Sequence, residues 1–342
     1  MNWKETTDSE RNLKIYNEEI RDFIPQKIFD FHVHVFNEEI LPKRNPGLEL
    51  PGVHIKNYTI SELKNDMKSI YPGKEFFAVV FGYPEYSYDS DINNKYVERN
   101  SDRKAIFPFR LVRPDEVPEK IEEEIKASNF FGIKPYLNYV TWKPPDDIEI
   151  NDMIPESIME VVNRYGLIVM LHIPRKARLA DPVNQKQICD LALSFPDTKI
   201  VLAHTGRAYY LKNIVGSIER IKNLKNVYCD ISMINNWEVL EYLFKHFDHK
   251  RIIYGTDIPI SLCGGKSIEI NDQYTYVTRY PWHLSISDDH KKLVFTSFIY
   301  EEIRAVKKAK SRLNLGMNFL EDIFYNNGME LIKSINRSFV NE

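Results

Sequence analysis

The apolar runs LIVMLHI (residues 167–173), KIVLAH (199–204), NVYCDI (226–231) and RIIYGTD (251–257) follow one another along the second half of the chain. Each is short and almost continuously apolar, a pattern typical of strands buried on both faces of a parallel sheet. Four runs of the same kind come earlier, at residues 27–36, 75–82, 105–112 and 130–137. The sequence therefore predicts eight buried parallel strands.

The segments between these runs have the period of amphipathic helices. Apolar side chains recur at the spacing i, i+3, i+4 and i+7, for example at Ile158, Val161, Val162 and Tyr165. Strands that alternate with helices predict an α/β protein, and eight such pairs predict a single (β/α)₈ TIM barrel.

The chain is longer than a barrel requires. A typical barrel uses about 250 residues, and this chain has 342. We place the additional residues in an N-terminal lead (1–26), in long strand-end loops (37–74, 83–103 and 259–290) and in a C-terminal helical extension (291–342), with the barrel domain spanning 27–342. The loop 259–290 is rich in aromatic residues, so we expect it to form a lid or a wall at the active-site face.

Composition excludes several classes of partner. The 46 basic and 49 acidic residues are closely mixed and give a net charge of −3, which argues against nucleic-acid binding. There is no apolar run of ~18 residues, so no membrane span is expected. A polar N-terminus and three scattered cysteines favour a cytoplasmic protein with reduced thiols. A homodimer is expected only because most oligomers are of this kind.

Polar residues capable of chemistry follow several of the predicted strands. His32 and His34 end the first strand, His172 the fifth, His204 the sixth and Asp257 the eighth. Each alone has an ordinary structural explanation, such as a buried hydrogen-bonded histidine or a helix cap. Together they account for four of the nine histidines in the chain. Because strand ends form the active site of a barrel, this set predicts a metal-binding or catalytic centre.

Four strand-end motifs and the tail of the chain resemble one family. HVH (32–34), His172, AHTG (203–206) and YGTDIP (254–259) resemble the amidohydrolase superfamily, and LEDIFYNNGMELI (320–332) is similar to its closing helix. The resemblance is to the "amidohydrolase 2" branch, which includes aminocarboxymuconate-semialdehyde decarboxylase and related hydrolases, hydratases and lactonases.

The resemblance implies a role for each strand-end residue. His32, His34, His172 and Asp257 are expected to bind one divalent metal per chain, most often Zn²⁺, and His204 is expected to lie beside the bound water or the substrate. Such an ion lowers the pKa of bound water to about 7 and polarises a carbonyl group. Asp257 or His204 is then expected to act as the catalytic acid–base group.

Three cations near strand ends are candidates for substrate binding. Lys134 lies in the fourth strand, where binuclear relatives carry a carboxylated lysine that bridges two metals. That role implies two metals, whereas contact with an anionic substrate or a structural ion pair implies one. Arg110 and Arg175 are expected to bind a substrate carboxylate, and salt bridges at the barrel rim are the alternative.

The sequence thus predicts a metal-dependent hydrolase that acts on a small, carboxylate-bearing molecule. One alternative is a non-oxidative decarboxylase, a lyase that uses the same mononuclear metal site. The other is a catalytically inactive barrel that serves as a binding protein. The fold does not distinguish these functions.

Overall fold

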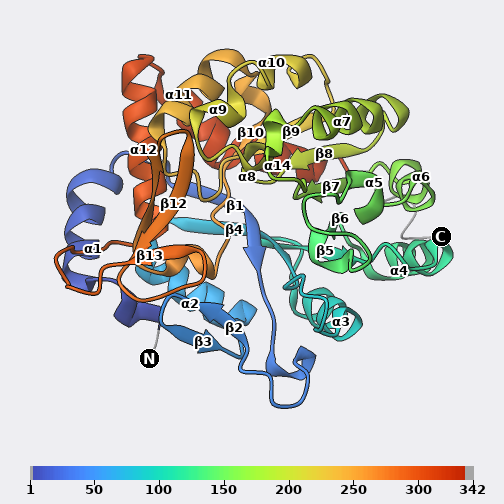
Figure 1. Cartoon of the computed structure of the whole chain (residues 1–342), viewed down its shortest axis with the longest axis horizontal. Coiled ribbons are helices and arrows are strands. Elements are labelled where there is room, and N and C mark those ends of the chain that lie inside the picture. The colour runs from blue at the N-terminus through green and yellow to red at the C-terminus, as the bar shows by residue number, and fades with distance from the viewer. Residues whose placement is uncertain (1–2, 336–342) are drawn as a thin grey trace.

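Eight parallel strands form the centre of the computed structural model, which describes residues 3–335 (Figure 1). Each strand pairs with the next one along the barrel, in the order β1-β4-β5-β6-β7-β8-β9-β10. Their bounds are Lys27–His34 (β1), Glu75–Phe81 (β4), Ile106–Val112 (β5), Gly132–Pro135 (β6), Ile168–Leu171 (β7), Lys199–Leu202 (β8), Val227–Asp230 (β9) and Ile252–Ile253 (β10). Every one lies within a predicted run, so the (β/α)₈ barrel is confirmed.

The barrel closes where its first and last strands meet. The Phe31 N–H donates to the Tyr254 carbonyl at 2.9 Å, and the Asp257 N–H donates to the His32 carbonyl at 2.9 Å. A third bond runs from the His34 N–H to Ile258 O at 2.8 Å. The closing seam therefore contains residues of the predicted metal site.

Helices surround the barrel, as the helical spacing predicted (Figure 1). In α6, Ile158, Val161 and Val162 are all buried, so this apolar stripe faces the core. The α-helices that lie between the first and the last barrel strand in the chain are α2 (Ile60–Ile70), α3 (Ser90–Asn100), α4 (Pro118–Ser128), α5 (Ile150–Met153), α6 (Glu156–Arg164), α7 (Pro182–Ser194), α8 (His204–Arg207), α9 (Leu211–Ile214), α10 (Ile218–Ile221) and α11 (Trp237–His246). No helix within residues 3–335 is both long and apolar enough to cross a membrane.

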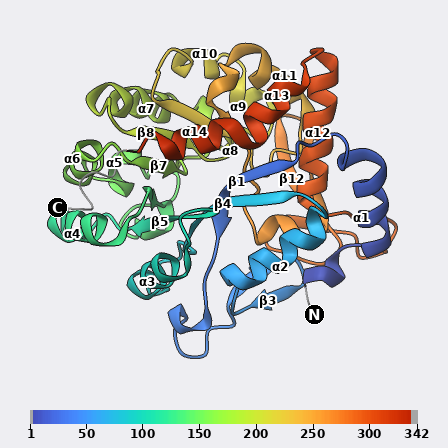
Figure 2. The same ribbon diagram turned by 180° about the vertical axis from the view of Figure 1, so that it is seen from behind.

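Helices from both ends of the chain complete the molecule. They are α1 (Ser9–Ile15), α12 (Phe298–Arg312), α13 (Met317–Glu321) and α14 (Asn327–Lys333), with π-helical segments at Tyr16–Ile20 and Asp322–Asn326. Figure 2, the view from behind, shows α14 crossing in front of the barrel strands, on the side turned away from the viewer in Figure 1. Its Asn327 side chain donates to the carbonyls of His249 (2.7 Å) and Ile252 (2.8 Å), which holds the helix to β10. Residues 1–2 of the predicted lead and 336–342 of the predicted extension lie outside the described residues.

Two of the predicted loops contain β-structure. The loop 259–290 forms a three-stranded sheet of β11 (Gly265–Ile270), β12 (Gln273–Thr278) and β13 (Ser285–Ser287). The stretch 37–74 contains the hairpin of β2 (Leu48–Leu50) and β3 (Val53–Ile55) before α2. These strands are short, and their side chains do not form a continuous apolar run, so the criterion used for barrel strands missed them.

The hairpin and the inserted sheet meet. Glu49 of β2 pairs with His283 at 2.9 Å, and the Gly52 N–H donates to Pro281 O at 3.1 Å. Gly52 has a φ of +73°, and a Cβ there would collide with the ring of Tyr280. Because both the backbone conformation and the close approach exclude a side chain, glycine is required at this contact.

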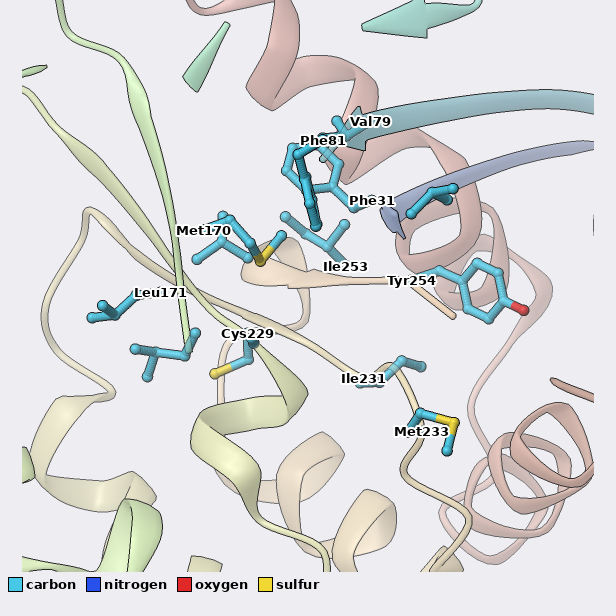
Figure 3. Packing of buried hydrophobic residues seen from close by; sticks show 14 of the residues in the cluster. Phe31, Val79, Phe81, Met170, Leu171, Cys229, Ile231, Met233, Ile253 and Tyr254 are labelled. Carbon is cyan, nitrogen blue, oxygen red and sulfur yellow. The ribbon is translucent and has the colours of Figure 1, made fainter. Parts of the chain in front are cut away.

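Apolar side chains from different strands fill the core (Figure 3). Phe31 of β1, Phe81 of β4, Met170 of β7 and Ile253 of β10 are all fully buried. This packing fixes the strand ends on which the polar residues stand.

Candidate metal centre

The five strand-end residues converge on one cavity. His32, His34, His172, His204 and Asp257 all line a cavity of about 660 Å³. His32 and His34 are two residues apart in β1, and their ring centroids lie 5.5 Å apart. The structure therefore brings together every residue of the predicted metal set, with His204 among them.

The carboxylate of Asp257 lies at the middle of this group. Its Oδ1 is 3.2 Å from His34 Nε2 and 3.4 Å from His32 Nε2, and its Oδ2 is 3.9 Å from His204 Nε2. His32, His204 and Asp257 each offer one ligand atom within 4.8 Å of the other two. His204 is thus as close to the centre as residues that were predicted to be ligands.

The Nδ1 atoms of three histidines are bound to acceptors. His34 Nδ1 lies 3.0 Å from Gly82 O, and His204 Nδ1 lies 3.0 Å from Ser232 O. His32 Nδ1 lies 2.9 Å from the Asp230 carboxylate. These partners favour the tautomer with a proton on Nδ1, which leaves the Nε2 lone pair free. Histidines that bind metals commonly have such a partner behind the ring.

Asp230 was not predicted as a site residue. Besides the bond with the His32 ring, Asp230 accepts hydrogen bonds from the backbone N–H of His204 at 2.8 Å and from Ser232 Oγ at 2.6 Å. It ends β9, the seventh barrel strand, so its strand-end position was a signal that the sequence offered. Asp230 therefore orients the His32 ring directly and holds the His204 backbone, and it does not line the cavity.

His172 lies at the edge of the centre. It is only 8% exposed, and its Nδ1 atom has no hydrogen-bond partner within residues 3–335. Its ring centroid is 4.6 Å from that of Tyr136 and 5.4 Å from that of His204. A buried nitrogen without a partner is unfavourable, and a bound ligand would satisfy it.

Burial and charge set the protonation of the centre. Burial lowers the pKa of His32 to about 3, and it also lowers the pKa values of His172 and His204. Burial alone would raise the pKa of Asp257, but His32, His204 and His34 hold it well below its usual value. At neutral pH the centre therefore presents neutral imidazoles and an ionised carboxylate. This donor set fits Zn²⁺ or a similar divalent ion.

Lys134 of β6 reaches the same centre. Its side chain is fully buried, and Nζ lies 3.4 Å from His32 Nε2 and 4.9 Å from the centroid of the Phe81 ring. Burial lowers the pKa of Lys134 to about 8. The neutral amine is therefore accessible near physiological pH.

The structure does not support the predicted substrate role of Arg110. Its side chain is fully buried, with Nε 2.7 Å from Glu124 and Nη2 2.8 Å from Glu116, and it does not line the cavity. Arg110 holds β5 to the segment around α4. A buried guanidinium with two carboxylate partners has no donor directed to a substrate.

Arg175 is also directed away from the cavity, because its Nε donates to Asp181 at 3.0 Å. The arginine that lines the cavity is Arg207, which follows AHTG. Arg207 donates to the carbonyls of Ile173 (3.2 Å) and Arg175 (3.4 Å). It forms no ion pair within the described part of the chain. Of the arginines near strand ends, the two that the sequence singled out thus do not line the cavity, whereas Arg207 does.

The fold and the site together define a (β/α)₈ barrel with a candidate metal centre at the carboxyl ends of its strands. The sequence model of the Amidohydrolase family matches residues 29–273. The chain belongs to this family. No curated protein matched the sequence.

Solved structures with the same fold include three proteins whose names describe different activities. Amidohydrolase 2 from Bifidobacterium longum subsp. infantis is 16% identical, with a TM-score of 0.55 over 91% of this chain and 100% of that one. A putative 2-pyrone-4,6-dicarboxylic acid hydrolase from Pseudomonas putida is 14% identical, with a TM-score of 0.54 over 91% and 99%. 5-Carboxyvanillate decarboxylase from Sphingomonas paucimobilis is 12% identical, with a TM-score of 0.54 over 90% and 99%. At these identities the likeness concerns the fold.

Proposed function

We propose that the protein is a metal-dependent hydrolase that acts on a small, carboxylate-bearing molecule. One observation carries the proposal. Three imidazoles have Nδ1 bound to an acceptor, and their Nε2 atoms all lie within 3.9 Å of the Asp257 carboxylate. Histidines with a purely structural role would not be expected to direct their Nε2 atoms to one carboxylate.

The donor set names the residues that would hold the metal. We propose His32, His34, His172 and Asp257 as ligands of one divalent ion, most often Zn²⁺ in this family. The position of His204 is equally compatible with ligation or with a place beside the substrate. When bound, such an ion activates water and polarises a carbonyl group.

The chain's own residues supply the remaining functions. We propose that Asp257 and His204 hold and move the proton during hydrolysis, because both line the cavity and their side chains are 3.9 Å apart. We propose that Arg207 binds the substrate carboxylate, because it is the only arginine or lysine among the described residues that line the cavity.

Lys134 has two proposed roles that metal stoichiometry separates. With one metal, its amine lies beside the centre as a cation for an anionic substrate. With two, the carboxylated lysine would be a bridging ligand. The buried position and the lowered pKa of Lys134 are compatible with both.

Elemental analysis tests the proposal. We expect about one equivalent of metal per chain in the purified protein, and its loss in the His32→Ala, His34→Ala double variant. His290→Ala, at an exposed histidine outside the cavity, is the matched control and should retain the metal. Two equivalents would favour the bridging role of Lys134. Absence of metal after reconstitution would contradict the proposal and favour an inactive barrel.

Activity assays then separate the reactions. Acid release from esters or lactones that carry a carboxylate supports a hydrolase. Carbon dioxide release from aromatic acids would instead assign the same centre to a decarboxylase.

A further inference from the structure

Segments that follow different strands build the cavity beyond the candidate metal centre. One wall contains Arg207 with three tyrosines that follow β8 or belong to the inserted sheet. A second wall comes from segments after β1, β4 and β6, and its polar residues include Asn45, Glu49, Glu85, Ser87 and Asn138. The two walls therefore differ in charge.

The acidic wall contains one carboxylate without a basic partner. Glu85 is half-buried and accepts bonds from Asn138 Nδ2 at 3.1 Å and from the Tyr86 N–H at 3.0 Å. It forms no ion pair within residues 3–335. Each carboxylate oxygen can accept a further hydrogen bond, so Glu85 remains able to bind a donor in the cavity.

Glu49 differs from Glu85 in this respect. It pairs with His283 at 2.9 Å, and His54 lies opposite it in the hairpin register. The Glu49 carboxylate is therefore already paired with the His283 imidazole, and its residue lies opposite His54. Outside the candidate metal centre, Glu85 and Arg207 are left as the carboxylate and the guanidinium that line the cavity without a charged partner among the described residues.

Tyr136 shows that both charges act on the same space. Burial raises the pKa of its hydroxyl group, Asp257 and Glu85 raise it further, and Arg207 opposes them. The hydroxyl is thus within electrostatic reach of the metal centre and of both walls.

We infer that the substrate is amphoteric, with a carboxylate that pairs with Arg207 and a protonated amine that pairs with Glu85. This inference rests on the proposed function and adds the chemical class of the substrate. A second carboxylate in place of the amine would lie against Glu85 and be repelled. The tyrosines that line the same cavity, Tyr209, Tyr274 and Tyr276, offer apolar ring surface to the body of the substrate.

Matched ligands test the inference on the metal-loaded protein. Binding is measured by calorimetry for para-(aminomethyl)benzoate against terephthalate, and for ε-aminocaproate against adipate; in both pairs a carboxylate replaces the aminomethyl group. Para-toluate, which has no second charge, is the reference. We expect each amine to bind about ten-fold more tightly than its dicarboxylate partner, because juxtaposed like charges weaken binding by at least this factor.

Two variants show whether Glu85 is responsible. Glu85→Gln keeps the shape of the side chain and should reduce the preference to about two-fold or less. Glu123→Gln, on the exposed face of α4, should leave it unchanged. If Glu85→Gln does not fold, the ligand pairs on the wild-type protein decide alone.

The outcomes separate this inference from the proposed function. A dicarboxylate that binds as tightly as its amine partner, or a preference that persists in Glu85→Gln, would overturn the amphoteric substrate only. Failure of every ligand to bind, para-toluate included, would overturn the carboxylate-bearing substrate itself and this inference with it. Metal content, measured on the same samples, reports separately on the metal centre.

Discussion

Glu302 of α12 is a buried acid whose ionisation should govern the pH dependence of stability. Its side chain is fully buried, and its Oε2 accepts the Met233 N–H at 2.9 Å. Burial raises the pKa of Glu302 well above its usual value, and the charges of Asp30, Asp230 and Asp257 act in the same direction. We expect the carboxyl group to be protonated in the folded protein and ionised in the unfolded chain at neutral pH.

The sign and size of the effect follow from proton linkage. Above the unfolded pKa, the folded state holds one proton more than the unfolded chain, so stability falls as pH rises toward the folded pKa. A difference of one proton changes the free energy of unfolding by about 1.4 kcal/mol per pH unit. Glu302→Gln cannot ionise and should lack this loss. As pH rises from the unfolded pKa toward the folded pKa, the variant should therefore gain stability relative to wild type, by up to about 1.4 kcal/mol per pH unit.

Urea denaturation of metal-free protein at several pH values measures this difference. Subtracting the wild-type curve from the variant curve cancels the contribution of other buried groups, such as Asp30. Glu123→Gln, at an exposed position, is the control and should give a flat difference. A flat difference for Glu302→Gln as well would refute the reasoning, because Glu302 would then titrate alike in both states.

Three further perturbations follow from the structure. Arg110→Met should lower the free energy of unfolding by about 1–3 kcal/mol, since it removes the buried guanidinium that binds the partly buried carboxylates of Glu116 and Glu124. Thermal melting measures this, and ligand binding by the folded fraction should be unchanged. Asp230→Asn should weaken metal affinity by about 10–100-fold, because it replaces the charged carboxylate behind His32 with a neutral amide that has only one acceptor oxygen. Competition with a chelator measures that affinity, and an unchanged value would contradict the orienting role. Gly265→Ala should destabilise the fold by about 1–3 kcal/mol, because its Cβ would collide with the Phe298 ring. An unchanged denaturation midpoint would show that the ring can move.

The sequence predicted the barrel because continuous apolar runs report burial on both faces directly. It predicted the placement of the strand-end histidines for a related reason. The carboxyl ends of parallel strands meet at one face, so residues far apart in sequence converge there. The confirmed strands and the shared cavity both depend on this geometry, which needs no knowledge of the loops.

The arginines show where this reasoning stops. Arg110 lies near the end of β5, but closeness to a strand end does not tell which side of the barrel wall a side chain faces. The Arg110 side chain is directed to Glu116 and Glu124 rather than to the cavity. Glu85 and Arg207 lie on segments after strands, and their unpaired charges are visible only when neighbouring side chains have been placed.

The seam between β1 and β10 has a consequence for the order in which the molecule becomes functional. His32 and Asp257 are more than two hundred residues apart in sequence, and the bond between their backbones is part of barrel closure. During synthesis, the first strand is therefore made long before Asp257, whose carboxylate lies against the Nε2 atoms of His32 and His34. A chain that stops short of Asp257 contains three of the four proposed ligands, His32, His34 and His172, but no closed barrel to hold them together. The metal site should thus be complete only when the barrel has closed. The protein should therefore become able to bind the ion, and to catalyse its reaction, at the step that completes folding.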